Sequence, residues 1–211
     1  MREETWFNDF VFKVDEFLNA DECETYIQMA EDIGFEDALV TTARGSIRVP
    51  SLRNNERVMF QNEEVANALW ERASDFVPTE FESRSACGVN ELIRFYRYDP
   101  GQQFNWHQDF SFERDGGERS GEKSYLTFLI YLNDGFEGGE TSFDDSYSDD
   151  SFDEFQVVPS KGMALFFEHP IYHKGEPVTK GRKYVMRTDV MYSADDSEDR
   201  QFESFDDVDN W

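Results

Sequence analysis

The chain contains three histidines, and two of them stand where one metal ion could use both. His107 begins an H-x-D triplet that ends at Asp109, directly after a predicted strand, and His173 follows 66 positions later (173 minus 107). Two imidazoles and one carboxylate on one face of an octahedron form mononuclear non-haem Fe(II) sites and leave three positions open for other ligands. The sequence therefore predicts an iron site made of His107, Asp109 and His173.

A single H-x-D triplet is weak evidence, because such triplets also occur by chance. The alternative is that His107 is a hydrogen-bonded histidine at the end of a strand and that Asp109 is a turn carboxylate. Residues i and i+2 of a strand point to the same side, so a strand over residues 104–110 would direct both side chains at one metal ion. The distal histidine and the basic residues that follow it favour the metal site.

The third histidine, His169, competes with His173 for the distal metal position. Pro170 follows His169 directly, which favours the end of a predicted strand over residues 163–168. We therefore expect His169 to be structural or to contact the ligands, and His173 to be the metal ligand.

A basic side chain beyond His173 could bind the remote carboxylate of a dicarboxylic co-substrate in a dry pocket, where a charge-assisted hydrogen bond is strong. Arg182, Lys183 and Arg187 compete for this role. On a closing strand over residues 182–192, Lys183 and Arg187 share one face, whereas Arg182 points to the other. The alternation favours Lys183 or Arg187, and ordinary pairing with the abundant surface acids is the alternative for both.

The elements that must position these residues change in character along the chain. The first part is predicted to contain a strand at 6–18, a helix from a capping box at Asn19 and Glu22 to Ile33, loop and short strand at 40–60, and a helix at 63–76. From residue 89 short strands follow, predicted at 90–98, 104–110, 124–132, 155–158, 163–168 and 182–192. Regular short strands are typical of a jelly-roll. We therefore expect a mainly β chain whose jelly-roll core is flanked by N-terminal helices.

The composition narrows the possible partners. The chain has 211 residues, 46 acidic and 20 basic, with a net charge of −26, and such a surface would repel nucleic acids and anionic membranes. The favoured interpretation of the charge is a strongly solvated surface; attraction of a basic peptide and calcium binding are the alternatives. No run of eighteen apolar residues and no signal peptide is present, which predicts a soluble, cytoplasmic protein. Cys23 and Cys87 form no disulfide framework, and Cys23 is expected in the core.

Three segments are rich in polar residues. The glycine-rich segment 111–123 is predicted to be mobile and could act as a lid beside the metal. The segment 144–154 is acidic but lacks the pattern of an EF-hand loop, so a solvated loop is favoured over a calcium site. The acidic tail 194–211 has little to bury and is expected to be disordered.

Several linked motifs between about residues 90 and 192 resemble those of one family. The run RYDPGQ at 97–102 precedes His107 as in the pattern Y-x-x-G-x-x-x-x-x-H-x-D. The runs YLN at 131–133 and GGET at 138–141 follow, and PSKGMALFF at 159–167 leads to His173, with Lys183 ten positions later. In these motifs and their order, the chain resembles the 2-oxoglutarate- and Fe(II)-dependent dioxygenases, specifically their prolyl 4-hydroxylase-like branch.

The resemblance implies a role for individual residues. His107, Asp109 and His173 would hold Fe(II), and Lys183 would bind the C5 carboxylate of 2-oxoglutarate. The remaining residues that would contact or surround the co-substrate are Tyr98, Tyr131, Thr127 and Arg187. O2 would be the oxidant, and ascorbate is a further cofactor that the resemblance suggests.

The resemblance also implies an activity. The chain would couple the decarboxylation of 2-oxoglutarate to succinate and CO2 with hydroxylation of an unactivated C–H bond, foremost in a prolyl residue of a peptide or protein. The same chemistry on a free amino acid or another small molecule is the nearest alternative, and a non-catalytic cupin-like binding module is the alternative from another class. A single domain is expected over residues 1–193, with a supporting part at 1–88 and the jelly-roll core at 89–193, followed by the tail.

Overall fold

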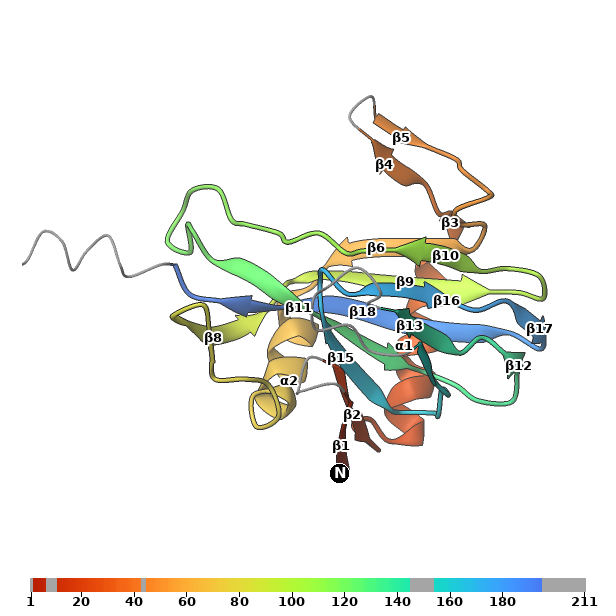
Figure 1. The fold of residues 1–211 in the computed structure, drawn as a ribbon, viewed down its shortest axis with the longest axis horizontal. Helices are drawn as coiled ribbons and strands as arrows, with labels where there is room; N and C mark the ends of the chain where they lie inside the picture. Colours follow the sequence, from red (N-terminus) through yellow and green to blue (C-terminus); the bar gives the residue numbers. More distant parts are fainter. Residues whose placement is uncertain (1, 7–10, 43–44, 145–153, 195–211) are drawn as a thin grey trace, which may run out of the picture.

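The computed structural model describes residues 2–6, 11–42, 45–144 and 154–194. Within these ranges the protein consists of two helices, two main β-sheets that pack face to face and two short strand pairs (Figure 1). The tail beyond residue 194 and residues 145–153 of the acidic segment, for which disorder and a solvated loop were predicted, lie outside the described residues.

The large sheet forms the centre of the fold. In spatial order its strands are β1 (Arg2–Trp6), β2 (Val11–Asp15), β15 (Ala164–Glu168), β11 (Lys123–Tyr131), β18 (Lys183–Tyr192), β9 (Leu92–Tyr98), β6 (Glu56–Gln61) and β3 (Glu36–Asp37). Two further strands extend it, because β8 (Arg84–Val89) pairs with the end of β18 and with β7 (Glu80–Phe81). All of these pairings are antiparallel.

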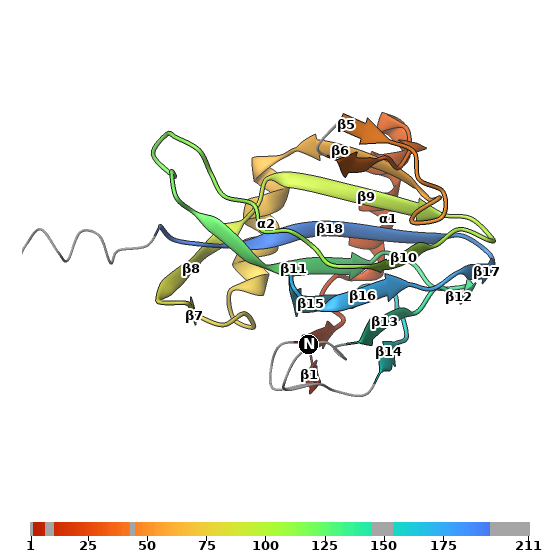
Figure 2. The same ribbon diagram turned by 45° about the horizontal axis from the view of Figure 1, so that its top comes forward.

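The small sheet lies across the large one near β11 and β18 (Figure 2). Its strands are β10 (Phe104–His107), β16 (Tyr172–Gly175), β13 (Thr141–Asp144) and β14 (Phe155–Val157). Two short pairs stand apart, β12 (Glu137–Gly138) with β17 (Val178–Lys180) and β4 (Val40–Thr42) with β5 (Gly45–Ile47). This sandwich of two antiparallel sheets is the expected jelly-roll.

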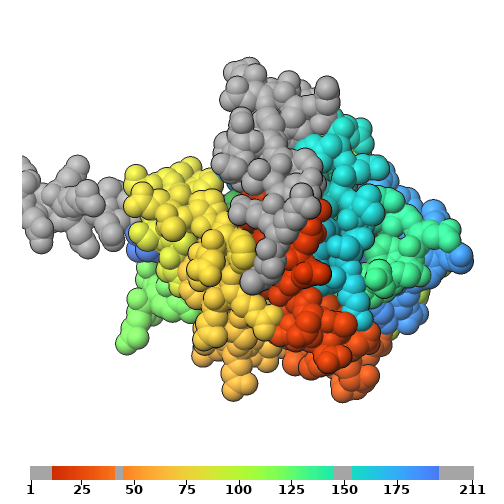
Figure 3. Space-filling model, turned by 90° about the horizontal axis from the view of Figure 1, so that it is seen from below, coloured from red at the N-terminus to blue at the C-terminus, as the bar shows by residue number. Residues whose placement is uncertain are grey.

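The two helices, α1 (Ala20–Ile33) and α2 (Glu63–Ala73), cover the face of the large sheet that points away from the small sheet (Figure 1). Seen from below in Figure 3, the red-orange segment of α1 and the yellow-orange segment of α2 lie side by side, and Arg72 joins them through an ion pair with Glu22. The predicted capping box is present: the Glu22 N–H donates to Asn19 Oδ1 (3.0 Å), and the Asn19 N–H donates to Glu22 Oε2 (2.8 Å). No helix among the described residues is long and apolar enough to cross a membrane.

Alternation along the central strands creates two apolar layers. On β11 and β9, Phe128 and Phe95 point toward the helices, where Cys23 and Leu69 are also buried. Tyr131 on the same strand β11 points instead toward the small sheet. The strands at the centre of the large sheet therefore present one face to a helical core and the other to the space between the sheets.

Several predicted boundaries were wrong. The strand predicted at 6–18 is divided into β1 and β2, and the second helix ends at Ala73 rather than at residue 76. The short strands β13, β16 and β8 were not predicted at all. The most consequential error concerns the strand predicted at 104–110, which ends at His107, so that Asp109 lies beyond it.

Candidate active site

A pocket lies between the two sheets, lined by residues of β9, β11 and β18 on one side and of β10, β13 and β16 on the other. Its empty space measures about 430 Å³, including its open mouth. The lining residues are Tyr96, Tyr98, Phe104, His107, Asp109, Thr127, Leu129, Thr141, Phe167, His173, Gly175, Lys183, Val185 and Arg187. Every predicted site residue except Tyr131 lines this pocket.

His107 and His173 meet because β10 and β16 pair antiparallel with these two residues opposite each other. Their ring centroids are 4.1 Å apart. His107 Nδ1 lies 2.8 Å from the carbonyl oxygen of Asn105, and His173 Nδ1 lies 3.0 Å from that of Ile171. A carbonyl can only accept, so each Nδ1 carries the proton and each Nε2 keeps a lone pair. Burial, and for His107 also the neighbouring His173, lowers the pKa of each imidazole below its ordinary value. Both rings are therefore neutral ligands at neutral pH.

Asp109 reaches the same place from a loop, not from a strand as predicted. Its backbone N–H donates to the carbonyl of His169 (3.0 Å). Its carboxylate accepts the hydroxyl of Thr127 at Oδ2 (2.6 Å) and pairs through Oδ1 with Arg187 Nη1 (2.8 Å). Burial alone would raise the pKa of Asp109, but the Arg187 guanidinium and the hydrogen bond from Thr127 lower it below its usual range. The carboxylate is thus buried, ionised and fixed in direction.

The three side chains form the arrangement that a divalent cation requires. One ligand atom from each of His107, Asp109 and His173 can be chosen so that all lie within 4.8 Å of one another. His107 Nε2 is 4.0 Å from Asp109 Oδ1, and His173 Nε2 is 3.6 Å from Asp109 Oδ2. Two unprotonated nitrogens directed toward an anion repel it unless a cation lies between them. The donor set therefore fits a metal ion of the kind predicted, held by two nitrogens and one oxygen.

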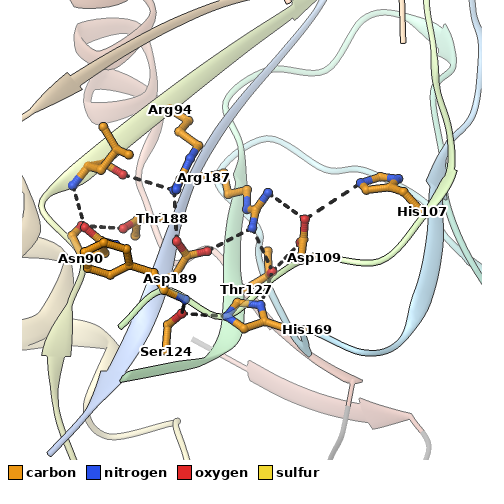
Figure 4. A network of polar contacts seen from close by, with 12 residues as sticks. Asn90, Arg94, His107, Asp109, Ser124, Thr127, His169, Arg187, Thr188 and Asp189 are labelled. Carbon is orange, nitrogen blue, oxygen red and sulfur yellow. Dashed lines mark hydrogen bonds and ion pairs between the residues drawn. The ribbon is translucent and has the colours of Figure 1, made fainter. Parts of the chain in front are cut away.

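His169 lies next to this cluster without joining it (Figure 4). It is buried, its Nδ1 lies 3.1 Å from Thr127 Oγ1, and its Nε2 lies 2.9 Å from Ser124 Oγ. Because the Thr127 hydroxyl donates to Asp109, His169 Nδ1 must donate to Thr127, and Ser124 donates to Nε2. Burial lowers the pKa of His169 to about 4, in keeping with a neutral ring. His169 therefore supports the Asp109 carboxylate through Thr127, in agreement with the structural role expected for it.

Lys183 lies in the same pocket with its ammonium buried and 3% of the residue exposed. Its Nζ donates to the carbonyl of Gly139 (2.5 Å) and lies 5.3 Å and 5.1 Å from the ring centroids of Tyr98 and Tyr131. Among the described residues no carboxylate forms an ion pair with it. Burial lowers the pKa of Lys183 to about 7, against a smaller opposing effect of Glu140. The pocket therefore contains a cation that lacks a counter-ion.

The alternation predicted for the closing strand is confirmed. Lys183, Val185 and Arg187 all line the pocket, whereas Arg182 points away and pairs with Asp99 at 2.6 Å. Arg187, predicted to contact or surround a co-substrate, also pairs with Asp109 and, through Nη2, with Asp189 (3.0 Å). Figure 4 shows this chain of contacts continuing to Arg94. In the structure the charge of Arg187 is thus used to hold Asp109.

Several pocket residues were not predicted. Thr141, the last residue of the GGET run, lines the pocket and is hydrogen-bonded through its hydroxyl to the hydroxyl of Tyr131 (2.6 Å). Tyr131 therefore contacts a residue of the pocket wall without lining the pocket itself. Phe104 stacks on His107 with ring centroids 3.5 Å apart. Thr141 and Phe104 both lie inside the motifs of the sequence analysis, so their positions in those motifs could have identified them. Arg53 lies in a loop far from these motifs and lines a neighbouring hollow rather than this pocket, and it had no such signal.

The segment 111–123 was predicted to be mobile, with a lid over the metal as one of its possible roles. Arg114 pairs with Glu122 at 2.9 Å and with Glu91 at 2.5 Å, and Arg119 pairs with the same two carboxylates. None of the residues 111–123 lines the pocket. The segment is therefore held against the start of β9 by ion pairs and does not cover the metal cluster in the described structure.

Comparisons with known proteins agree with this site. The model of the 2OG-Fe(II) oxygenase superfamily matches residues 93–188. A probable prolyl 4-hydroxylase 8 of Arabidopsis thaliana is 26% identical over 193 residues, covering 80% of this chain and 63% of the plant protein. The chain spans 63–64% of the length of this and three further plant prolyl 4-hydroxylases.

Solved structures share the fold. A viral collagen prolyl hydroxylase from Paramecium bursaria Chlorella virus-1, in complex with 2OG, superposes with a TM-score of 0.60 at 23% identity, covering 87% of this chain and 97% of that chain. A prolyl hydroxylase of Trichoplax adhaerens, in complex with a peptide fragment of hypoxia inducible factor, gives a TM-score of 0.63 at 16% identity, covering 93% and 88%. The family model over residues 93–188, the plant relatives and the site geometry lead to one conclusion: the chain resembles the 2OG-Fe(II) oxygenases, and among them the prolyl 4-hydroxylases.

Proposed function

We propose that the protein is an Fe(II)- and 2-oxoglutarate-dependent dioxygenase that hydroxylates an unactivated C–H bond, foremost in a prolyl residue of a peptide or protein. The observation that carries the proposal is the convergence of His107, Asp109 and His173 in a pocket that also holds the unpaired ammonium of Lys183. A metal at one place and a buried cation at another in one pocket suit a ligand that chelates at one end and carries a carboxylate at the other.

Each residue then has a defined task. His107 and His173 would supply neutral nitrogen ligands, because their Nδ1 protons are held by backbone carbonyls. Asp109 would supply the carboxylate, kept ionised by Arg187. Lys183 would receive the C5 carboxylate of 2-oxoglutarate. When bound, Fe(II) and 2-oxoglutarate supply the oxidation, in which one atom of O2 enters succinate, CO2 is released and the other atom becomes the substrate hydroxyl.

The rest of the pocket would orient the co-substrate and limit the access of water. Tyr98 is buried, and burial raises the pKa of its hydroxyl, so it remains a neutral hydrogen-bonding group. Leu129, Val185 and Phe167 line the remainder of the pocket with apolar surface. A pocket of low polarity strengthens each charged contact made inside it.

Support for a prolyl substrate comes from the relatives. The curated relatives include prolyl 4-hydroxylases, and one structural neighbour was solved with a peptide fragment.

The test is anaerobic addition of Fe(II) and 2-oxoglutarate to the purified protein, followed by visible absorption spectroscopy. We expect the weak charge-transfer band of the chelate in the wild type and in His169→Ala, and its loss in His173→Ala. Proline-containing peptides with O2 should then give succinate and a matching mass gain in the peptide. A band that survives in His173→Ala but disappears in His169→Ala would show that the distal ligand is misassigned, and failure of the wild type to bind metal would contradict the proposal.

A further inference from the structure

A second hollow opens beside the metal cluster and shares five residues with the inner pocket. We call it the outer hollow; its empty space measures about 860 Å³, including its open mouth. The shared residues are Tyr96, Phe104, His107, Asp109 and Arg187, and the others are Leu39, Val40, Leu52, Arg53, Arg57, Arg94, Gln108 and Phe110. A group held in the outer hollow would therefore lie next to the metal ligands.

Arg53 is fixed in the wall of the outer hollow by its backbone. It forms a bridge with Phe104, the first residue of β10, and its N–H donates to the carbonyl of Val49 (2.9 Å). The guanidinium lies over the ring of Phe104, 4.1 Å from the centroid, and 5.1 Å from that of Tyr96. Since Phe104 stacks in turn on His107, the guanidinium, the phenyl ring and the imidazole form one stack.

The charge of Arg53 is buried without a counter-ion. Only 5% of the residue is exposed, its Nε donates to the neutral amide oxygen of Asn55 (3.2 Å), and its Nη2 is buried without a hydrogen-bond partner. The faces of the guanidinium are covered by the rings of Phe104 and Tyr96. This stacking leaves the in-plane N–H groups of Nη2 unsatisfied, and an unsatisfied buried donor on a charged group is costly.

This absence of a partner is unusual in a chain with 46 acidic residues. Among the arginines whose side chains the structure describes, those that pair with a carboxylate are Arg48, Arg72, Arg94, Arg97, Arg114, Arg119, Arg182 and Arg187. Of the three others, Arg84 donates to two backbone carbonyls. The remaining two, Arg53 and Arg57, both line the outer hollow.

Arg57 adds a second positive charge to the same wall. It is partly buried, and burial together with the charges of Arg53 and Arg94 lowers its pKa from the ordinary value. Two guanidinium groups that repel each other and lack acids would be stabilised by an anion placed between them and the metal cluster. A guanidinium presents parallel N–H groups that match the two oxygens of a carboxylate.

We propose that the outer hollow binds a carboxylate of the substrate, through Arg53 with Arg57, and so places the neighbouring C–H bond at the metal. The proposal rests on the proposed function and names its substrate class: an acid, whether the carboxylate is that of a free imino acid or of an acidic side chain beside the reacting residue. Arg53 is here a residue that selects and positions the substrate.

The experiment is isothermal titration of the Fe(II)-loaded protein, kept anaerobic with saturating 2-oxoglutarate so that Lys183 is not free to bind the probes. The probes are two acid–amide pairs: L-proline against L-prolinamide, and end-blocked peptides that carry Glu or Gln next to proline. We expect the acid of one pair to bind at least about tenfold more tightly than its amide, the scale of one charged hydrogen bond. The pair that shows the difference identifies the source of the carboxylate.

Substitutions assign the effect to the hollow. Arg53→Gln should remove the preference for the acid, and Arg57→Gln should reduce it while leaving the stack on Phe104 in place. Arg48→Gln is the matched control, because Arg48 is exposed and pairs with Asp37. Amides that bind as tightly as acids, a preference that survives Arg53→Gln, or no binding of any probe would overturn the proposal.

The charge-transfer band of Fe(II) and 2-oxoglutarate, recorded on the same samples, separates this proposal from the proposed function. If the band is present in both the wild type and Arg53→Gln but neither protein prefers the acids, only the proposed carboxylate site in the outer hollow is contradicted. If the wild type shows no band, the proposed function is contradicted, regardless of how the acid and amide probes bind. A band that is lost in Arg53→Gln would show that the variant disturbs the metal site, and the Arg57→Gln result then decides.

Discussion

Individual charged side chains determine the chemistry of this pocket, and Lys183 and Asp109 have opposite environments. Asp109 is kept ionised by the guanidinium of Arg187 and the hydroxyl of Thr127. Lys183 is buried among tyrosine rings and one carbonyl, and no described carboxylate pairs with it. The first arrangement suits a permanent metal ligand, and the second suits a site whose counter-ion arrives with the ligand.

The pKa of Lys183, about 7 in the free protein, predicts how 2-oxoglutarate binding depends on pH. Above pH 7 the free ammonium loses its proton, whereas a bound carboxylate favours the charged form and raises the pKa. Binding should therefore take up a proton, and affinity should fall by up to about tenfold per pH unit as pH rises above 7. Titration calorimetry in two buffers of different ionisation enthalpy measures the proton uptake. Lys183→Met should bind weakly with no such uptake, and equal uptake in both proteins would contradict the assignment.

Thr127 should couple stability to metal affinity. Thr127→Val removes the hydroxyl that donates to Asp109 and leaves His169 Nδ1 without its acceptor. We expect a loss of about 1–3 kcal/mol in unfolding free energy and about 10- to 100-fold weaker Fe(II) binding. Thr188→Val is the control, because Thr188 is equally buried but donates to the carbonyl of Asn90. It should lower stability while Fe(II) affinity stays unchanged; a similar loss of affinity in both variants would mean that the effect is not specific to Asp109.

At the scale of elements, the site depends on how strands of two sheets are brought into register. β10 and β16 place His107 opposite His173, and β18 pairs with β9 so that Lys183 lies opposite Tyr98. The turn before β15 holds the N-terminal part to this framework, because the N–H of Gly162 donates to Tyr131 (2.8 Å) and its carbonyl accepts from Leu18 (3.0 Å). A glycine is required at position 162 because its φ is positive and because no space is left for a Cβ atom.

Gly162→Ala should be strongly destabilising. Gly162 has φ +79°, and an added Cβ would lie 2.0 Å from the carbonyl oxygen of Leu18. Gly135 has the same φ, but a Cβ added there would meet no atom within 4 Å, so Gly135→Ala isolates the backbone strain. In urea unfolding we expect a loss of about 1–2 kcal/mol for Gly135→Ala and about 3 kcal/mol or more for Gly162→Ala. Equal losses would show that the collision with Leu18 is relieved without cost.

For the whole molecule, the net charge of −26 and the arginines of the outer hollow act in opposite directions. The acidic surface would repel an acidic substrate at long range, and the outer hollow would attract its carboxylate at short range. Attraction of a basic peptide, one interpretation of the composition, is therefore not what the residues beside the metal cluster favour. The long-range part is screened by salt, with a Debye length of about 30 Å at 0.01 M and about 8 Å at 0.15 M.

The same excess charge predicts that salt stabilises the fold. Self-repulsion opposes the compact state, so screening it should raise the unfolding temperature between about 10 mM and about 500 mM NaCl. Calorimetry at constant pH measures the shift. A fall in unfolding temperature would instead show that ion pairs such as those of Arg97 with Glu31 and Glu56 contribute more than the repulsion.

What could be predicted from the sequence was local. The types of the ligand residues and their order could be read from the motifs. The two-residue period of the closing strand distinguished Lys183 and Arg187 from Arg182, because alternation is a property of any strand. The capping box of α1 followed from two residues three positions apart. His173 was chosen over His169 from the proline that follows His169, and the structure places His173 in the ligand cluster.

Tertiary structure decided the rest. Asp109 lies beyond the end of β10, and its direction is set by Arg187, Thr127 and the carbonyl of His169, which are all distant in the sequence. β16, which carries His173, has four residues, too few to show a pattern until β10 and β13 pair with it. Arg53 looked like a loop residue, and only its bridge to Phe104, far along the chain, buries its charge beside the metal cluster. Strand periodicity and helix capping are determined by residues that are neighbours in the sequence, whereas burial and charge pairing depend on contacts between residues far apart in the sequence.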